Sequence, residues 1–370
     1  MKIIFFCGSL EPGHDGVGDY TRRLCGAVVK AGCQAQIISL CDNQCTTFST
    51  EKQEVDEAEV LVHRIPVSTT NKQRFIWTQE ILGKFQPDWI SMQFVPYSYN
   101  VKGLPFWLPS FIKKLKGNHK LHIMFHELWI GMDDNPTFKS KLIGFLQKKI
   151  VLKIIKAKSK TIINTQTDLY QFKINALGYN AEILPLFSNI TKNSQLQVKS
   201  MPSEFELNFC IFGNIHYGAP VEKFIEDLNQ FLLESNDKRV LKFIFIGNSG
   251  VAIEEWKKVL LAKNINFEIT GFATDKKIGV FLSNCQYGIS TTPYILNQKS
   301  GSLMAMFDYH LPVLCVARKW TVEGFDQRIF LNLVNYENKE TIKEFINRKF
   351  IVSEEHNLDF VALKFLKGLK

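Results

Sequence analysis

Residues 2–40 read KIIFFCGSLEPGHDGVGDYTRRLCGAVVKAGCQAQIISL. A short apolar run leads into a loop that carries Gly13, Gly16 and Gly18, a stretch with helical spacing follows, and a second apolar run ends the segment. A strand, a helix and another strand in this order are typical of parallel α/β sheets. The segment therefore predicts that the chain begins as an α/β protein.

The same alternation continues along the chain. Stretches with a helical pattern, for example residues 220–235, PVEKFIEDLNQFLLES, separate most of the apolar runs. Because the runs are rich in Val, Ile and Phe, we expect them to be buried strands of parallel sheets. The further runs are WISMQFV, LHIMFHE, KTIINT and AEILPL in the first half, and FCIFGN, KFIFIG, FEITGF, YGISTT and PVLCVA in the second half.

A polar, aperiodic segment, residues 187–207, separates the two sets of strands. It contains Pro202, and it is typical of an interdomain linker. A chain of 370 residues is also long for a single hydrophobic core. We therefore expect two Rossmann-like domains that face a central cleft, over residues 1–190 and 205–350. The basic amphipathic segment 355–370 is expected to form a helix that joins the first domain.

The composition is that of a soluble globular protein, with 45% hydrophobic and 22% charged residues. The N-terminal apolar run is too short for a signal peptide, and no uninterrupted apolar run approaches the ~18 residues of a membrane span. The eight cysteines are scattered, and the CxxxC spacing of Cys41 and Cys45 is poor evidence for zinc. These features predict a cytoplasmic protein with free thiols.

The net charge of +9 predicts an anionic partner, such as a nucleotide, a nucleic acid or an anionic lipid. A nucleic acid is the weakest of these interpretations, because the lysines are spread through the chain and no recognised binding module is visible. We therefore expect no nucleic-acid partner.

Residues 297–314, NQKSGSLMAMFDYHLPVL, combine a loop, a helix and the start of a strand. The N–H groups at a helix start are unpaired and carry a partial positive charge. Ser300 or Ser302 can cap this helix, Gly301 lets a ligand approach the backbone, and Lys299 adds a full charge. Together these residues predict a phosphate site. The alternative is an ordinary capped helix with a surface lysine.

Ligands of open α/β sheets bind beyond the carboxyl ends of the strands, where the first half of the chain carries several polar groups. Its glycine loop at a helix start suits a phosphate or a sugar hydroxyl, and a tight turn for packing is the alternative. Gln93 lies near the end of one predicted strand and Tyr97 follows it, and His126 and Glu127 end the next. Tyr97 could equally cover the core, and His126 could be structural.

The strands of the second half also end in glycines and polar groups. Gly213 and Asn214 follow one strand, and Gly271 and Phe272 follow another. With the phosphate site, they predict a nucleotide-type ligand in the interdomain cleft. No DxD metal motif, P-loop or G-x-S-x-G elbow is present, and Asp133-Asp134 is typical of a turn.

Four stretches together resemble the retaining GT-B glycosyltransferases of glycosyltransferase family 4. PGHDGVGDYTRRLCGAVVKAG is similar to the family's glycine loop and first helix, and HIMFHELW to the strand that ends in its active-site histidine. CIFGNI is similar to the first strand of the nucleotide domain, and CQYGISTTPYILNQKSGSLMAMFDYHLPVL to the donor-binding segment. The resemblance covers nearly the whole chain and depends on the order and spacing of these motifs.

The chain departs from the family's pattern at donor-binding positions. The family usually has two glutamates eight positions apart, and Asn297 and Ala305 occupy those positions here. An Arg and a Lys usually follow the strand that matches CIFG, and Asn214 and Ala219 stand in their place. The sequence therefore does not specify which sugar the donor carries. A non-catalytic relative that binds a nucleotide or a glycan is the alternative to an enzyme.

Lys299 would then supply the missing positive charge, with Arg318 or Lys319 after the next strand. The resemblance implies transfer of a sugar from a UDP- or GDP-linked donor to a hydroxyl of a glycan or lipid-linked acceptor. It further implies retention, no metal or other cofactor, and a place in glycan or polysaccharide biosynthesis. Strand ends and resemblance together lead us to expect catalysis by His126 and Glu127, donor contacts from Gly213, Asn214, Gly271, Phe272, Lys299, Ser300, Gly301 and Ser302, and acceptor contacts from Gly16, Val17, Gly18, Asp19, Tyr20, Gln93 and Tyr97.

Residues 137–160, TFKSKLIGFLQKKIVLKIIKAKSK, predict a helix with a wide apolar face and eight lysines. One interpretation is a helix packed on the first domain with its lysines in water. The other is a basic surface that holds the protein against anionic lipid, near a lipid-linked acceptor. The second interpretation predicts a peripheral location at the cytoplasmic face of the membrane.

Overall fold

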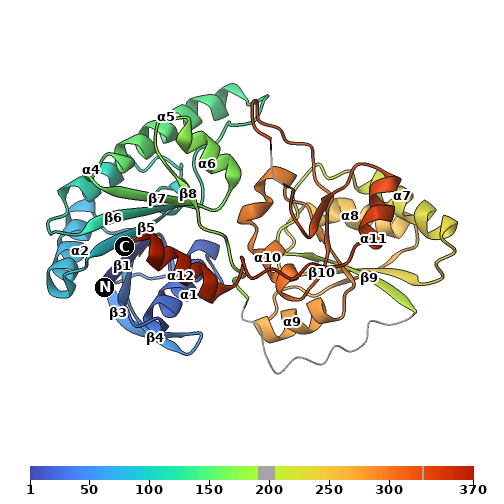
Figure 1. Ribbon diagram of the computed structural model, residues 1–370, viewed down its shortest axis with the longest axis horizontal. Coiled ribbons are helices and arrows are strands. Elements are labelled where there is room, and N and C mark those ends of the chain that lie inside the picture. The colour runs from blue at the N-terminus through green and yellow to red at the C-terminus, as the bar shows by residue number, and fades with distance from the viewer. Residues whose placement is uncertain (191–204, 327–328) are drawn as a thin grey trace. The chain divides into compact units, whose positions relative to one another are not determined.

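The computed structural model describes residues 1–190, 205–326 and 329–370 (Figure 1). The chain divides into two compact units: unit 1 comprises Met1–Phe187, Val322–Phe325 and Glu355–Lys370, and unit 2 comprises Ser188–Thr321 and Asp326–Glu354. Each unit contains one largely parallel sheet flanked by helices. The predicted α/β class with two Rossmann-like sheets is confirmed, whereas the central cleft stays a prediction. Most of the predicted linker, residues 191–204, lies outside the described residues.

The sheet of unit 1 has the strand order β3-β4-β2-β1-β5-β6-β7-β8. Neighbouring strands pair in parallel, except that β3 and β4 form an antiparallel hairpin. The strands are β1 Lys2–Cys7, β2 Gln34–Asp42, β3 Ser49–Val55, β4 Ala58–Pro66, β5 Trp89–Phe94, β6 Lys120–Phe125, β7 Thr161–Thr165 and β8 Glu182–Ile183.

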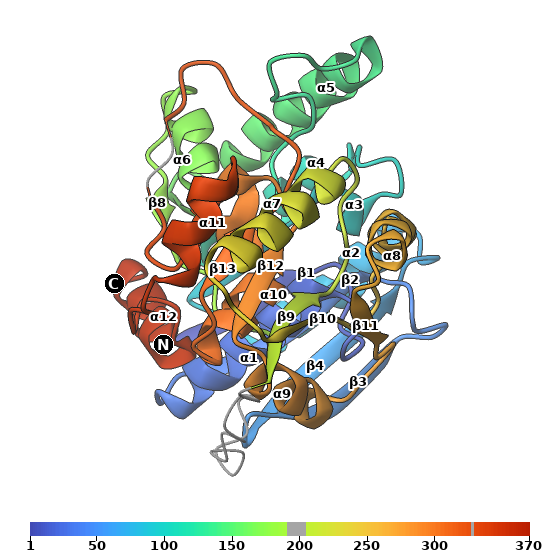
Figure 2. The ribbon, with the colours of Figure 1, turned by 90° about the vertical axis from the view of Figure 1, so that its right-hand side faces the viewer.

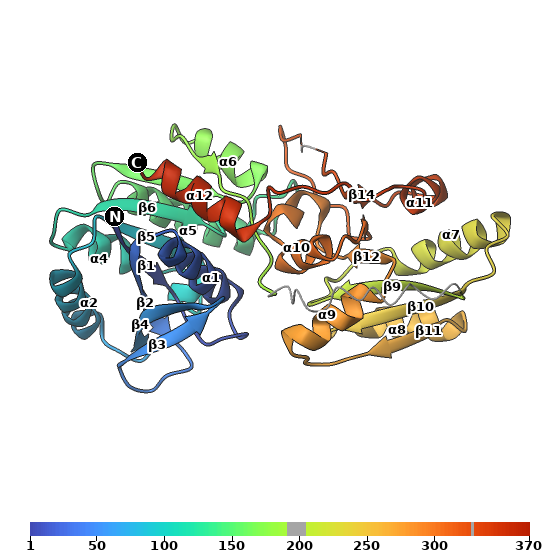
Figure 3. The same cartoon turned by 60° about the horizontal axis from the view of Figure 1, so that its bottom comes forward.

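The helices of unit 1 include one from the far end of the chain. Figure 3 shows α12 beside α1, and the ring of Phe365 in α12 lies 5.7 Å from that of Phe5 in β1. The C-terminal segment therefore completes the core of unit 1. The helices are α1 Gly16–Lys30, α2 Asn71–Phe85, α3 Pro96–Tyr99, α4 Leu108–Lys114, α5 Phe138–Ile155, α6 Asp168–Asn175 and α12 Leu358–Gly368.

The sheet of unit 2 is parallel, with the strand order β11-β10-β9-β12-β13-β14. Its strands are β9 Glu206–Phe212, β10 Val240–Ile246, β11 Asn266–Ile269, β12 Tyr287–Ser290, β13 Val313–Cys315 and β14 Leu333–Asn335. Its helices are α7 Val221–Glu234, α8 Ile253–Ala262, α9 Asp275–Ser283, the 3₁₀ helix η2 Tyr294–Lys299, α10 Gly301–Asp308 and α11 Lys339–Ile346.

Trp256 of α8 anchors the core of unit 2. Its side chain is fully buried, and its ring lies about 6 Å from the rings of Phe224, Phe243 and Phe245. Figure 2 shows α7 and α11 side by side over the same sheet. Burial of several large aromatic rings supplies much of the free energy that holds these helices on the strands.

The β3–β4 hairpin and β14 are not among the predicted strands. Strand β3, STEKQEV, alternates between exposed and less exposed positions and carries charged residues, so it lacks the apolar run that marked the buried strands. The hairpin turns at Asp56 and Glu57, which both adopt a positive φ without glycine. Asp56 is held there by an ion pair with Arg23 of α1 at 2.7 Å. The predicted strand at 181–186 was too long, since β8 covers only Glu182–Ile183.

In the described ranges, no helix is both long and apolar enough to cross a membrane. All eight cysteines are free thiols, as the sequence predicted.

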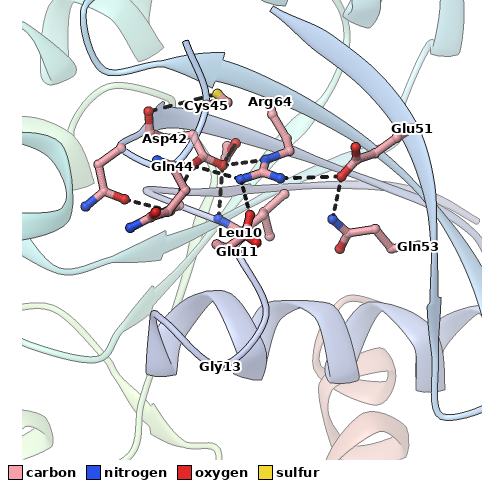
Figure 4. A network of polar contacts seen from close by, with 12 residues as sticks. Leu10, Glu11, Gly13, Asp42, Gln44, Cys45, Glu51, Gln53 and Arg64 are labelled. Carbon is pink, nitrogen blue, oxygen red and sulfur yellow. Dashed lines mark hydrogen bonds and ion pairs between the residues drawn. The ribbon is translucent and has the colours of Figure 1, made fainter. Parts of the chain in front are cut away.

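A buried ion pair fixes the loop that follows β1 (Figure 4). The Asp42 side chain is fully buried, and its Oδ2 lies 2.9 Å from Nε of Arg64. The same carboxylate accepts hydrogen bonds from the hydroxyl group of Ser9 and the N–H group of Leu10. Arg64 also pairs with Glu11 at 2.7 Å. The ends of β2 and β4 thus hold the first residues of the glycine loop.

These contacts stabilise the charged form of Asp42. Although burial alone would raise its pKa, the hydrogen bonds and charge of Arg64 together with the N–H group of Gln44 lower the pKa below 3.8. The folded protein therefore binds this proton less readily than the unfolded chain does.

We predict that Asp42→Ala lowers the free energy of unfolding by about 3–5 kcal/mol, because Arg64 would remain buried without its principal counter-ion. The loss of unfolding free energy should be full above pH 3.8. It should shrink as the pH falls through the lowered pKa, because below that pH Asp42 is protonated in both the folded and the unfolded protein. Urea unfolding at several pH values measures it. Glu59→Ala, which removes an exposed partner of Lys52, is the control and should cost less than about 1 kcal/mol. Equal losses in both variants would contradict the assignment.

Candidate functional site

The predicted phosphate site in unit 2 has the geometry of a capped helix start. Ser300 is the N-cap of α10, and its hydroxyl oxygen accepts a hydrogen bond from the N–H group of Leu303 at 3.2 Å. The Ser302 hydroxyl lies 3.3 Å from that of Ser300. A helix start leaves the N–H groups of Gly301 and Ser302 without partners inside the helix. The segment therefore presents backbone donors and hydroxyl groups together.

The end of β9 meets this helix start. Gly213 has a φ of 81°, and a Cβ atom placed on it would lie 3.6 Å from the Ser302 side chain. Its neighbour Asn214 is exposed, and a Cβ atom placed on Gly250 would lie 2.5 Å from the Asn214 Oδ1 atom. The structure thus brings two of the predicted donor residues, Gly213 and Ser302, next to each other.

Positive charge gathers beside α10. The pKa of His216 is lowered by partial burial and then by the charges of Lys299 and Arg318. A Cβ atom placed on Gly218 would lie 3.4 Å from Cβ of Arg318, so this arginine lies along the loop that follows β9. Two cations and a titratable histidine therefore lie close enough to interact electrostatically, and this local positive charge favours an anionic ligand.

His216 is not among the predicted site residues. Its only signal was its place two residues after Asn214, in a loop that follows a buried strand. The hydrogen bond from its N–H group to the Thr291 hydroxyl, at 3.0 Å, fixes this loop against the end of β12.

The two positions where the family has glutamates are turned into the core. Asn297 is fully buried; its Nδ2 donates to the carbonyl of Thr292 at 2.8 Å, and its Oδ1 accepts from the Ser290 hydroxyl at 2.6 Å. Ala305 is fully buried in α10. The amide of Asn297 therefore holds the loop between β12 and α10 in shape.

Gly271 and Phe272 follow β11. Gly271 forms a bridge with Gly247 at the end of β10, and both have a positive φ. The Phe272 side chain is 81% exposed. An exposed ring at a strand end is suited to stacking against a flat ligand group.

In unit 1, three predicted residues come together. Nε2 of His126 lies 2.9 Å from Oε1 of Gln93, and both side chains are buried. The ring of Tyr20 lies edge-on to that of His126 at 4.8 Å and stacks on Phe187 at 4.6 Å. Burial raises the pKa of Tyr20 well above its ordinary value, and its hydroxyl has no hydrogen-bond partner among the described residues.

The glycine loop packs tightly against the end of β1. Asp15 caps α1 by accepting from the N–H groups of Val17 and Gly18. A Cβ atom on Gly18 would lie 2.5 Å from the carbonyl oxygen of Ser9, so only glycine fits. Asp19 accepts from the N–H group of Gly13 at 3.1 Å. These contacts support the packing interpretation of this loop, and Gly16 begins the helix as its first residue.

Tyr97 and Glu127 have different surroundings. The Tyr97 side chain is exposed and lies against Gly103 in a turn. The backbone N–H of Glu127 is 3.4 Å from the carbonyl oxygen of Phe94, and its residue is half-buried. Within residues 1–190, 205–326 and 329–370, no group of three or more His, Cys, Asp or Glu side chains could hold a metal ion.

No protein-family model and no curated protein sequence matches this chain. Solved structures do match. The lipopolysaccharide outer core galactosyltransferase WaaB in its apo form is 12% identical, with a TM-score of 0.56 over 100% of this chain and 99% of that one. A mutant of S. aureus TarM in complex with Fondaparinux, alpha-GlcNAc-glycerol and UDP is 11% identical, with a TM-score of 0.59 over 100% and 99%.

The UDP-GlcNAc 2-epimerase from Methanocaldococcus jannaschii is 11% identical, with a TM-score of 0.55 over 99% of each chain. At such identities the likeness shows the fold alone. The resemblance to GT-B glycosyltransferases is confirmed at that level, and membership of family 4 stays a prediction. Because an epimerase is also similar, the reaction has to be argued from the site.

We predict that Lys299→Gln raises the pKa of His216, because removal of a neighbouring positive charge favours the protonated ring. Arg318→Gln should act in the same direction. A proton NMR titration of the His216 ring measures both. Lys319→Gln is the matched control, since it removes a neighbouring charge other than the two that lower the pKa of His216, Lys299 and Arg318. An unchanged His216 pKa in both folded variants would show that these cations do not share one site.

Proposed function

We propose that this protein is a glycosyltransferase that moves a sugar from a nucleotide-sugar donor to an acceptor hydroxyl. The observation that carries the proposal is the place in unit 2 where Gly213, after β9, lies against Ser302 at the start of α10, with Lys299 and Arg318 both lowering the pKa of nearby His216. The fold that the chain shares with WaaB is consistent with it.

In this proposal the diphosphate of the donor binds at the start of α10. Its negative charge is stabilised by the N–H groups of Gly301 and Ser302, the Ser302 hydroxyl and Lys299. Gly213 and Asn214 border the same place, and the exposed ring of Phe272, next to Gly271, is proposed to stack on the base. UDP and GDP are the proposed nucleotides.

The reaction breaks the bond between the anomeric carbon and a phosphate oxygen of the donor. Developing negative charge on the leaving diphosphate is stabilised by a fixed lysine and by helix N–H groups. The acceptor oxygen forms the new bond from the same face, and its proton passes to a phosphate oxygen of the leaving group, so that the configuration is retained. His126, Glu127 and the residues around them in unit 1 are proposed to contact the sugar and the acceptor.

A non-catalytic binding protein is the second candidate, and the burial of Asn297 and Ala305 favours it. Neither side chain can contact a donor sugar as a glutamate at the surface could. A protein of this kind would bind the nucleotide without turnover.

We predict that Lys299→Ala weakens the binding of UDP or GDP by roughly 1–3 kcal/mol, the usual scale of a charge-assisted contact. Binding of the nucleoside without phosphates should barely change. Isothermal titration calorimetry measures both, and Lys276→Ala, an exposed lysine of unit 2, is the control. If the wild type binds none of the nucleoside diphosphates, or if the Lys299 variant keeps full affinity, the proposed site is wrong.

Helix α5 supports a contact with anionic lipid, near a lipid-linked acceptor. Phe138, Leu142 and Phe145 are 83%, 53% and 55% exposed, and their spacing places them on one face of the helix. Lys149 and Lys153 continue the same face and are exposed, and the Lys149 Nζ atom lies 5.2 Å from the Phe145 ring. An apolar strip followed by lysines is suited to the surface of an anionic membrane.

We predict that the wild type sediments with vesicles of phosphatidylglycerol and phosphatidylcholine, and not with phosphatidylcholine alone, and that salt releases it. Replacement of Phe138, Leu142 and Phe145 by Ser should abolish sedimentation. Val101→Ser, which changes an apolar side chain that is 89% exposed elsewhere in unit 1, is the control. Equal sedimentation with both vesicle types, or with neither, would rule out the electrostatic contact.

A further inference from the structure

A chain of hydrogen bonds crosses the sheet of unit 1, from His126 after β6 to the backbone of β8. Every side chain in it is buried, and it joins residues of β5, β6 and β7. The links are His126 Nε2 to Gln93 Oε1 at 2.9 Å, Gln93 Nε2 to Ser91 Oγ at 2.8 Å, Ser91 Oγ to His122 Nδ1 at 2.8 Å, His122 Nε2 to Asn164 Oδ1 at 2.9 Å, and Asn164 Nδ2 to the carbonyl oxygen of Glu182 at 3.0 Å.

The end of this series of hydrogen bonds at Glu182 fixes the direction of the bonds nearest to it. The carbonyl oxygen of Glu182 can only accept, so the Asn164 amide must donate to it, and its Oδ1 is left to accept. His122 therefore donates from Nε2. In a neutral imidazole the other nitrogen then has no proton, so Nδ1 of His122 accepts from the Ser91 hydroxyl.

The near end follows from the same rule. Because the Ser91 hydroxyl donates to His122, it can only accept from Gln93, and so the Gln93 amide nitrogen must face it. This orientation turns Oε1 of Gln93 toward His126. His126 must then carry its proton on Nε2, and each link donates in the same direction.

The surroundings keep His122 neutral. Its ring is fully buried and lies edge-on to Phe365 of α12 at 5.0 Å. Burial lowers the pKa of His122 to about 4, so the ring is uncharged near neutral pH. The register supports the geometry, because Ser91 is paired with His122, and Asn164 with Glu182, across adjacent strands.

We propose that Ser91, His122 and Asn164 are positioning residues that hold His126 in the tautomer with its proton on Nε2. Nδ1 of a neutral His126 is then an acceptor, which suits the O–H group of a sugar and disfavours an unprotonated phosphate oxygen. The inference rests on the proposed function, in which His126 contacts the sugar or the acceptor. It assigns His126 to a hydroxyl group and leaves the diphosphate to unit 2.

The test is long-range ¹H–¹⁵N NMR of the histidine side chains, on the protein without any nucleotide near pH 8. The protein has eight histidines, and the His126 signals are assigned from their loss in His126→Asn. The wild type is expected to show a protonated Nε2 and an unprotonated Nδ1 for His126. The opposite tautomer in the wild type would overturn the proposal.

Two variants test whether the chain sets this tautomer. Ser91→Ala removes the central link, so His126 should become a mixture of tautomers. Asn164→Asp places a carboxylate beside His122 and favours its charged form, which would then donate to Ser91 and reverse the chain, so His126 should change to the Nδ1–H form. Thr165→Val, which removes a buried hydroxyl that donates to the carbonyl of Phe125, is the control and should leave His126 unchanged.

A His126 pattern that stays as in the wild type in folded Ser91→Ala would overturn the proposal, and so would a control that changes it equally. Ser91→Ala is the smaller change and decides the matter if Asn164→Asp does not fold. Since no nucleotide is present, failure of the proposed function leaves this result readable. If a donor is turned over, Ser91→Ala should lower kcat by about tenfold, the scale of one lost hydrogen bond, with little change in donor KM, because His126 would no longer offer Nδ1 to the reacting sugar in a fixed state.

Discussion

Parallel pairing of the strands is the constraint on which both candidate sites depend. In a parallel sheet the carboxyl ends of all strands lie at one edge, so the residues that follow them meet there although they are far apart in the sequence. In unit 2 this brings Gly213 after β9 to the start of α10, which precedes β13. In unit 1 it brings Gln93, near the end of β5, to His126, which follows β6. Neither site needs a long loop to form.

Unit 1 carries two buried polar systems that do different work. The Asp42–Arg64 pair has full charges, and its hydrogen bonds hold the loop after β1 in place. The series of hydrogen bonds from His126 to β8 joins uncharged groups. All of its bonds donate in the same direction, and this direction sets the position of the proton on His126. A buried polar network is stable only when each donor and acceptor is satisfied, and this condition allows one arrangement of protons in the chain. A structural requirement of the core can thus determine the tautomer of a residue at the sheet edge.

The sequence was sufficient to predict the α/β class, most of the strands and the helix start at Gly301, because these depend on local patterns. The β3–β4 hairpin escaped because β3 is an edge strand whose alternation includes charges. Contacts such as Ser91 with His122 and His122 with Asn164 join residues 31 and 42 positions apart, and they depend on strand register. The lowered pKa of His216 likewise depends on the charges of Lys299 and Arg318, which are far from it in the sequence.

The central claim is that unit 2 holds a nucleotide-sugar whose bond to the diphosphate is broken with the help of Lys299. The most direct measurement is release of nucleoside diphosphate from a panel of UDP- and GDP-sugars, compared between the wild type and Lys299→Ala. The wild type is expected to hydrolyse at least one donor, and the variant to do so much more slowly with that donor. Tight binding of these donors without release of diphosphate from any of them would contradict it and would favour a binding protein.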